Sequence, residues 1–251
     1  MSRLTIKTAS EIAKMRAAGA IVRDALELLG KSAKAGVTTL ELDQIAVDFL
    51  GSRNAQASFL GYNGYPKSIC TSVNQEVVHG IPGGYKLREG DILSVDIGAV
   101  KDGYHGDAAR TFLIGEVAED ARKLVEVTRE CFFQGIEQAR EGNHLSDIAR
   151  AIEAHAHRHG YGVVRDLVGH GIGRAMHEPP EVPNFTDPRI GRGLRLMSGM
   201  TLAVEPMINM GDWRVREEAN GWTIVTLDGS LSAHYENTVA VTGGEAEILT
   251  L

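Results

Sequence analysis

Five residues between the middle and the end of the chain carry side chains that could jointly bind divalent metal ions: Asp96, Asp107, His170, Glu205 and Glu236. Four carboxylates and one imidazole form an oxygen-rich donor set, which suits Mn, Fe, Co, Zn or Mg better than a soft thiolate site would. Glu205 has apolar neighbours in LAVEPM (202–207), where a buried carboxylate is costly unless it is neutralised. A pair of divalent ions is the simplest reason for so many acids to point one way.

Asp96 and Asp107 lie on two segments that predict a β-hairpin. Residues 91–100 alternate between apolar and polar, as in a strand with two unlike faces. Asp102-Gly103 is a turn signal, and if it is a two-residue turn, Asp96 pairs with Ala109 and Asp107 is a diagonal neighbour. A longer turn would place the two acids directly opposite. Both registers put the carboxylates on one face, within about 5–8 Å of each other.

The other ligand candidates also lie in strand-like or turn-like sequence. His170 stands between two glycines after the apolar segment 161–168, which frees the backbone to turn and expose the imidazole. Pro206 lacks a backbone donor and predicts a strand end directly after Glu205. From the residues alone, solvated acids on an exposed sheet face remain the alternative to a metal site.

Helices are predicted on the N-terminal side of these segments. Two capping boxes, at Thr8 and Thr38, predict helix starts. The first helix is expected to end at Gly30, and Gly19 on its apolar face could allow a close packing contact. The second helix is expected over about 40–50.

The same order of elements recurs in the second half of the chain. Strand-like sequence over 57–114 is followed by helical patterns near 118–140 and 146–160, and then by further strands and turns. The segment at 35–46 resembles the one at 141–152, at an offset of 106 residues. Helix–helix–strands twice over suggests an internal duplication.

Composition excludes several classes of protein. The 251 residues fit one large domain (1–251), and 43% hydrophobic with 24% charged residues is ordinary for a globular protein. Two distant cysteines without a CxxC pairing predict neither disulfides nor a zinc knuckle, and hence a reducing compartment. The net charge of −7 argues against DNA, and no apolar run approaches a membrane span. We expect a cytoplasmic monomer.

Seven segments in fixed order resemble the type I methionine aminopeptidases, over nearly the whole chain. They are NQEVVHGIP (74–82), SVDIG (94–98), YHGDAART (104–111), VGHGIGR (168–174), AMHEPPEVPN (175–184), LAVEPM (202–207) and SAHYENT (232–238). The resemblance implies the pita-bread fold, an α+β arrangement with pseudo-twofold halves around a central antiparallel sheet. It also implies removal of the initiator methionine from newly made proteins.

The resemblance assigns a role to each ligand candidate. One ion would be held by Asp107, His170, Glu205 and Glu236, and a second by Asp96 with bridging help from Asp107 and Glu236. Glu205 would also act as general base. Co, Mn, Fe, Zn or Mg all fit this set, and metal availability commonly decides among them.

Two further histidines gain roles from the resemblance. His79 would donate a hydrogen bond to the amide beyond the scissile bond, and His177 would stabilise the oxyanion. Without the resemblance, a lone histidine is more often a satisfied core or surface residue. His105 and His234 share strand faces with Asp107 and Glu236, where either could support a ligand.

An apolar, deformable pocket would suit the unbranched, polarisable methionine side chain. By position, the family's pocket corresponds to Phe59, Tyr62, Tyr65, Cys70, Met176 and Trp222. Plain core packing is the alternative for each of them.

We therefore expect a dinuclear metal-dependent aminopeptidase that removes methionine when the second residue is small. Its partners would be the N-terminal segments of newly made proteins, with a transient ribosome contact left open. The spacing of Arg189, Arg192 and Arg195 favours a solvated loop over an RNA or ribosome contact.

Three alternatives remain from neighbouring or different classes. Proline-directed relatives usually carry an extra N-terminal domain, for which 251 residues leave no room. Type II methionine aminopeptidases carry a long insertion, too long for the segment between His177 and Glu205. A non-catalytic pita-bread binding scaffold would have lost metal ligands, whereas all five stand here.

Overall fold

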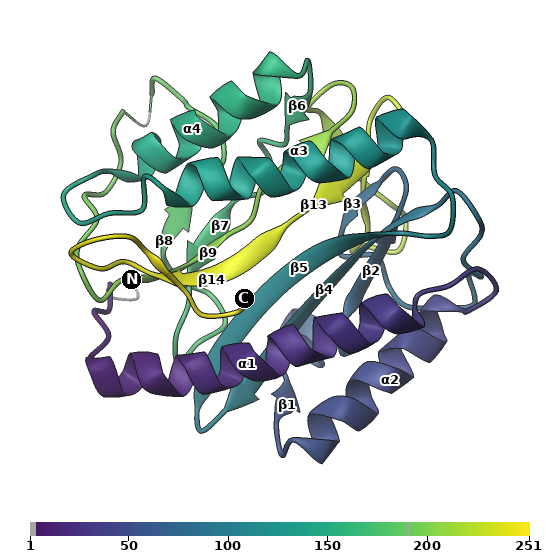
Figure 1. Cartoon of the computed structure of the whole chain (residues 1–251), viewed down its shortest axis with the longest axis horizontal. Helices are drawn as coiled ribbons and strands as arrows, with labels where there is room; N and C mark the ends of the chain where they lie inside the picture. Colours follow the sequence, from purple (N-terminus) through teal and green to yellow (C-terminus); the bar gives the residue numbers. More distant parts are fainter. Residues whose placement is uncertain (1–3, 190) are drawn as a thin grey trace.

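Two pairs of helices cover a central antiparallel sheet (Figure 1). The computed structural model describes residues 4–189 and 191–251. In the first half of the chain, α1 (Ala9–Ser32) and α2 (Thr39–Ser52) pack on the strands. In the second half, α3 (Glu119–Ile136) and α4 (Leu145–Arg158) take the equivalent place. The α+β prediction is confirmed.

The strands form three sheets within the described residues, and every pairing between them is antiparallel. The central sheet runs β1 (Gln56–Ala57), β4 (Ile92–Lys101), β5 (Tyr104–Leu113), β14 (Glu236–Ala240), β9 (Thr201–Val204), β7 (Gly169–Gly171) and β8 (Glu178–Val182), with β2 (Cys70–Val73) beside β4 and β15 (Glu247–Ile248) beside β14. The small sheets are β13 (Ser232–His234), β10 (Met207–Asn209) and β6 (Gly162–Val163), and β11 (Val215–Glu217), β12 (Ile224–Thr226) and β3 (Glu76–Val78).

Both predicted capping boxes form. The hydroxyl of Thr8 accepts a hydrogen bond from the backbone N–H of Glu11 at 3.3 Å, and the Glu11 carboxylate accepts one from the N–H of Thr8 at 2.9 Å. The prediction that α1 ends at Gly30 is wrong, because the helix continues to Ser32. A Cβ at Gly30 would lie 2.5 Å from Cε1 of Phe112. Glycine at this position allows close packing on β5 and does not stop the helix.

The second helix of each pair begins with the same hydrogen-bond pattern, at the offset seen in the sequence. Helix α2 begins at Thr39 and α4 at Leu145, which are 145 − 39 = 106 residues apart. The residue before each helix donates its backbone N–H to an acid three positions on, to Glu41 at 2.7 Å and to Asp147 at 2.9 Å. The same short pattern therefore starts the second helix of both pairs.

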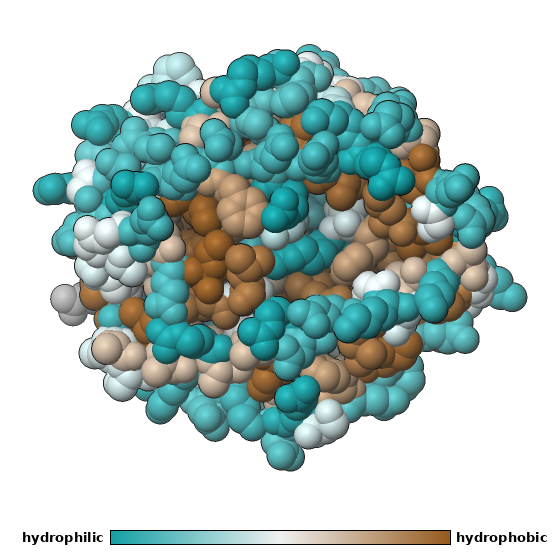
Figure 2. Space-filling model, viewed as in Figure 1, coloured by the Kyte–Doolittle hydropathy of each residue, from teal (hydrophilic) through white to brown (hydrophobic). Residues whose placement is uncertain are grey.

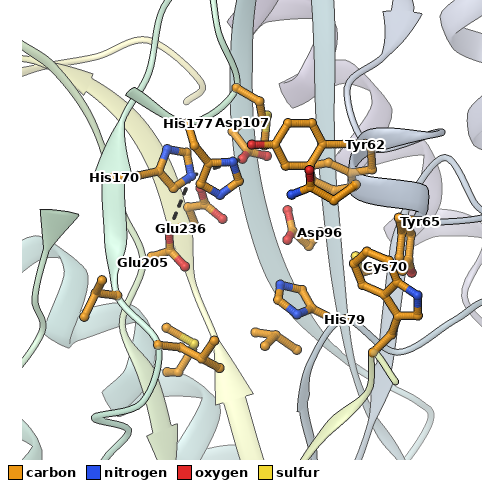
Figure 3. Close-up of a pocket in the computed structure, with 18 residues that line it drawn as sticks. Tyr62, Tyr65, Cys70, His79, Asp96, Asp107, His170, His177, Glu205 and Glu236 are labelled. Carbon is orange, nitrogen blue, oxygen red and sulfur yellow. Dashed lines mark ion pairs between the residues drawn. The ribbon is translucent and has the colours of Figure 1, made fainter. Parts of the chain in front are cut away.

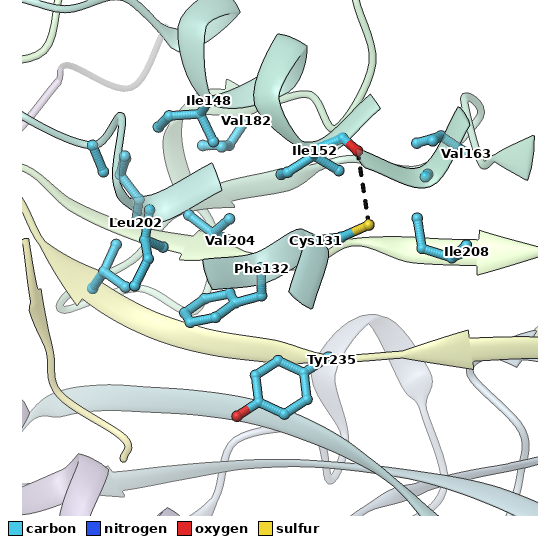
Figure 4. Packing of buried hydrophobic residues seen from close by; sticks show 14 of the residues in the cluster. Cys131, Phe132, Ile148, Ile152, Val163, Val182, Leu202, Val204, Ile208 and Tyr235 are labelled. Carbon is cyan, nitrogen blue, oxygen red and sulfur yellow. Dashed lines mark hydrogen bonds between the residues drawn. The ribbon is translucent and has the colours of Figure 1, made fainter. Parts of the chain in front are cut away.

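Each helix pair has its own hydrophobic core against the strands. Under the second pair, Cys131 and Phe132 of α3 face Ile152 of α4, Val204 of β9 and Tyr235 (Figure 4). Both cysteines are free and buried, as the absence of a CxxC pairing predicted. On the helical side of the molecule, hydrophobic side chains gather between the two helix pairs while hydrophilic ones dominate the rim (Figure 2).

Gly19 makes the close contact that its place on the apolar face of α1 suggested. A Cβ added there would overlap the backbone carbonyl of Leu249, whereas one at Gly51 in α2 would meet nothing within 4 Å. We expect Gly19→Ala to lower the free energy of unfolding by about 1–3 kcal/mol, because the backbone must shift to admit the methyl group.

Equilibrium unfolding in guanidinium chloride measures this difference, with Gly51→Ala as the matched control. That substitution should leave stability unchanged or raise it by up to about 1 kcal/mol through helix propensity alone. Equal effects of the two substitutions would show that the Gly19 contact carries no packing constraint.

Candidate active site

The hairpin of β4 and β5 fixes the position of the first two acids. Asp102 and Gly103 both have positive φ, 50° and 76°, which is the conformation of a type I′ two-residue turn. Asp96 consequently pairs with Ala109, and Asp107 pairs with Gly98. Of the two registers that the sequence left open, the two-residue turn is the one observed. The acids are diagonal neighbours on one face.

The neighbouring strand β14 brings a third acid to the same row of the sheet. Ala109 pairs with Asp96 on one side and with Glu236 on the other. Residues in one row across a sheet point to the same face. Because the alanine between the two acids is small, space is left for their carboxylates to converge above it.

The last two ligand candidates come from β9 and β7. Strand β9 ends at Val204, and Glu205 follows directly before Pro206, as predicted. His170 of β7 pairs with Ala203 of β9. Its Nε2 lies 3.7 Å from Oε1 of Glu205 and 4.0 Å from Oδ2 of Asp107 (Figure 3).

The tautomer of His170 suits a metal ligand. Its Nδ1 lies 2.8 Å from the backbone carbonyl of Gly171, which can only accept, so Nδ1 carries the proton. The Nε2 lone pair is therefore free and faces the carboxylates. A hydrogen bond of this kind is the usual way in which a ligating histidine is oriented.

The carboxylates are arranged as cation ligands. One oxygen each of Asp96, Asp107 and Glu236 is buried without a hydrogen-bond partner. Burial, and then repulsion from the neighbouring acids, raises the pKa of Asp96 and Glu236 well above the ordinary value, and burial likewise raises that of Glu205. Such a cluster is costly without a counter-charge. The donor set fits divalent metal ions.

One cavity collects every site residue that the sequence indicated. It is lined by the five ligand candidates, by His79 and His177, and by the six pocket candidates Phe59, Tyr62, Tyr65, Cys70, Met176 and Trp222. Residues from the first half of the chain form one wall, and His170, His177, Glu205 and Glu236 form the other (Figure 3). The site is thus assembled between the two halves.

His79 is held over the cavity in a strained backbone conformation. Its φ of 60° lies in the left-handed region, which is uncommon outside glycine. Gly80 follows, and a Cβ there would overlap the carbonyl of Thr71. Burial, and then the proximity of His177, lowers the pKa of His79 to about 4. The imidazole is therefore neutral at pH 7 and can donate one hydrogen bond.

His177 lies at the exposed mouth of the cavity. Its ring is 3.9 Å from that of His170 and stacks on Tyr62 at 5.2 Å, measured between ring centroids. Burial of the ring lowers its pKa below the ordinary value. His177 and His79 thus lie on opposite walls of the cavity, with the carboxylates between them (Figure 3).

The apolar end of the cavity is a separate cluster of side chains. Phe59, Tyr65, Cys70 and Met176 are buried together, and Trp222 packs against them. The Tyr65 hydroxyl donates toward the backbone carbonyls of Ile69 and Gly80, and its ring meets Trp222 edge-on at 5.0 Å.

Five further residues line the cavity and were not among the predicted site residues: Asn63, Val78, Leu167, Val168 and Met207. Val78, Val168 and Met207 lie within recognised motifs, while Asn63 follows Tyr62 and Leu167 precedes Val168. Their position in or beside predicted segments was the available signal.

The known proteins that match this chain agree with the donor set found in the cavity. Residues 13–243 match metallopeptidase family M24. The chain belongs to this family. A methionine aminopeptidase of Clostridium acetobutylicum is 57% identical over 249 residues, covering 99% of both chains. The crystal structure of a methionine aminopeptidase from Thermotoga maritima superposes with a TM-score of 0.95 at 45% identity, covering 99% of both chains.

More distant solved structures share the fold alone. An Xaa-Pro dipeptidase from Bacillus anthracis superposes with a TM-score of 0.78 at 23% identity, and this chain covers 61% of it. The pita-bread fold expected from the sequence is confirmed by these matches. Membership of a metallopeptidase family also agrees with the donor set in the cavity, and a requirement for divalent metal follows.

None of the helices within the described residues is both long and apolar enough to cross a membrane.

Proposed function

We propose that this M24 metallopeptidase is a methionine aminopeptidase that removes the N-terminal methionine of newly made proteins when the second residue is small. The observation that carries the proposal is the cavity itself. It joins a five-residue metal donor set to an apolar, aromatic end. Relatives named methionine aminopeptidase cover the whole chain at 42–57% identity.

The donor set supports a proposal of two ions, which Asp107 and Glu236 would share. Ligand atoms of Asp107, His170 and Glu236 lie within 4.8 Å of one another, and Asp96 lies in a second such group that again contains Glu236. Co, Mn, Fe, Zn and Mg all fit these donors. When bound, a pair of divalent ions lowers the pKa of a shared water and polarises a carbonyl.

Glu205 would transfer protons, and His79 and His177 would donate hydrogen bonds to the substrate. Glu205 is the natural general base, because its carboxylate lines the cavity beside His170 and can take a proton from water and return it to the departing amine. Neutral His79 donates a hydrogen bond to the carbonyl oxygen of the amide beyond the scissile bond. His177, at the mouth, donates to the carbonyl oxygen as negative charge develops on it.

The geometry also supports a size rule for the second residue. The methionine side chain occupies the apolar cluster around Tyr65 and Trp222, so the next residue must pass between His79 and His177. The wall is completed there by Tyr62, stacked on His177. A large side chain would collide with these rings.

A panel of Met-Xaa-Ser peptides tests the rule directly. Met-Gly-Ser, Met-Ala-Ser and Met-Ser-Ser should be cleaved well, while Lys, Leu or Phe at the second position should lower kcat/KM by at least about tenfold. At the first position norleucine should be tolerated, since a change of one methylene in an apolar site is worth only about 1–3 kcal/mol, whereas Lys or Glu should be refused.

Three outcomes would change the assignment. Equal rates for Met-Ala-Ser and Met-Lys-Ser would contradict the size rule. Preferred cleavage before proline in longer Xaa-Pro peptides would favour a proline-directed enzyme. A protein without bound metal and without cleavage of Met-Ala-Ser would be a binding scaffold. The cytoplasmic location, the monomeric state and a transient ribosome contact stay predictions.

A further inference from the structure

His234 is a buried histidine beside the metal donors for which the five-residue ligand set leaves no role. It ends β13, two residues before Glu236, and its side chain is 2% exposed. Its Nε2 is buried and has no hydrogen-bond partner. An imidazole nitrogen in that state is costly unless a donor, an acceptor or a cation satisfies it.

Two hydrogen bonds hold the backbone of His234 against β5, beside the site. Its N–H donates to the hydroxyl of Thr111 at 3.0 Å, and the same hydroxyl donates to its carbonyl at 2.9 Å. Thr111 lies on β5, the strand that also carries Asp107. The imidazole is therefore anchored to the strand that supports the metal donors.

The distances around Nε2 match ligands of one ion better than a hydrogen bond. Nε2 of His234 lies 3.7 Å from Oε2 of Glu236, beyond the roughly 2.7–3.2 Å of an N–H···O bond. Two atoms that share an ion, each about 2.0–2.2 Å from it, are separated by roughly 3–4 Å. The predicted ligand His170 shows the same spacing, with Nε2 3.7 Å from Glu205.

Two overlapping groups of donors emerge from the geometry. One contains Asp107, His170 and Glu236, and the other Asp96, His234 and Glu236, with the ligand atoms within 4.8 Å of one another in each. Glu236 belongs to both groups, as a bridging carboxylate must. Each group holds one imidazole.

We propose that His234 is a sixth protein ligand, which supplies a nitrogen donor to the ion held by Asp96. This inference rests on the proposed two-ion function. It makes each ion a mixed nitrogen–oxygen site, and the added imidazole favours Co, Zn or Fe over Mg at the Asp96 position, because Mg prefers oxygen ligands.

Proton NMR of the protein loaded with two equivalents of Co²⁺ tests the ligation directly. A histidine bound to Co²⁺ through Nε2 shows its Nδ1–H as a solvent-exchangeable resonance far outside the usual range. The wild-type protein should show two such resonances, from His170 and His234. His234→Gln should show one, because glutamine retains a hydrogen-bond donor near Glu236 but is a poor Co²⁺ ligand.

Metal affinity gives a second readout. Co²⁺ titration should show the weaker site of His234→Gln losing about tenfold or more in affinity, with Mg²⁺ affinity unchanged. Loss of an outer hydrogen bond alone costs a similar factor, so the resonance count decides between ligation and support. His105→Gln is the matched control, since His105 is a half-buried histidine near the site whose Nδ1 bonds Ser58 at 2.9 Å, and it should keep both resonances.

The outcomes separate this inference from the proposed function. One shifted N–H in the wild-type protein, unchanged in His234→Gln, overturns the ligand role of His234, and cleavage of Met-Ala-Ser by that protein leaves the proposed function intact. A protein that binds no Co²⁺ and cleaves nothing overturns both. The number of shifted N–H resonances in the wild-type protein is measured without any variant, so this test of the ligand role holds even if His234→Gln fails to fold.

Discussion

Exhaustive removal of divalent ions is expected to abolish cleavage of Met-Ala-Ser, and one added type of divalent ion should restore it. This is the largest effect that we expect, because the buried acids converge on one another as the ligands of cations would. Oxygens of Asp96, Asp107 and Glu236 have no partner in the protein, and burial with mutual repulsion raises the pKa of Asp96 and Glu236. Without ions, these acids favour the protonated state and the water that attacks the peptide is not activated.

The measurement combines peptide cleavage with the metal content of the same sample. The control receives the chelator already saturated with the ion under test, so that an effect of the chelator itself is excluded. Ion binding to the native state should also raise the melting temperature, in proportion to the logarithm of free ion over Kd. Full turnover in a sample whose metal removal has been verified would disprove the mechanism.

Replacing His79 is expected to lower kcat by roughly 10²–10⁴-fold, the usual scale for a positioned proton or hydrogen-bond donor. The metal content should stay unchanged, because His79 lies outside both donor groups. The backbone conformation of His79 allows two substitutions to be compared. At φ 60°, alanine is strained whereas glycine is not, so His79→Ala should be less stable than His79→Gly.

Both variants should nevertheless lose kcat to a similar extent, since both lack the imidazole. Steady-state kinetics, bound metal and melting temperature are measured on the two variants side by side. Recovery of activity in His79→Gly would show that the loss in His79→Ala arose from backbone strain. Loss of one ion in either variant would make His79 a metal ligand and contradict the assigned role.

Local sequence signals predicted the starts of two helices and the hairpin that carries two of the acids. The capping boxes at Thr8 and Thr38 started α1 and α2, because the hydrogen bonds involved join residues three apart. Asp102-Gly103 limited the hairpin to two registers, and both put Asp96 and Asp107 on one face. Gly30 was misread, because a helix stop and a close helix–strand contact both require glycine, and only the position of Phe112 distinguishes them.

Resemblance supplied what local signals could not, namely that all thirteen site residues belong together. Ligands such as Asp96 and Glu236 are 140 residues apart in the chain (236 − 96 = 140) and meet only because β4 and β14 both pair with β5 at Ala109. Alternation predicts which face of a strand is buried, but not which distant strand will lie beside it.

The sequence by itself therefore determined the chemical character of the site: an oxygen-rich metal donor set, an apolar pocket, and the family to which these motifs belong. The tertiary structure alone decided three things. It brought the candidate ligand atoms within 4.8 Å of one another in each donor group, it placed His79 in the left-handed conformation over the cavity, and it aimed Nε2 of His234 at Glu236. Each of the three depends on pairing between distant strands and on the burial of the side chains involved. None of them is encoded in the spacing of neighbouring residues.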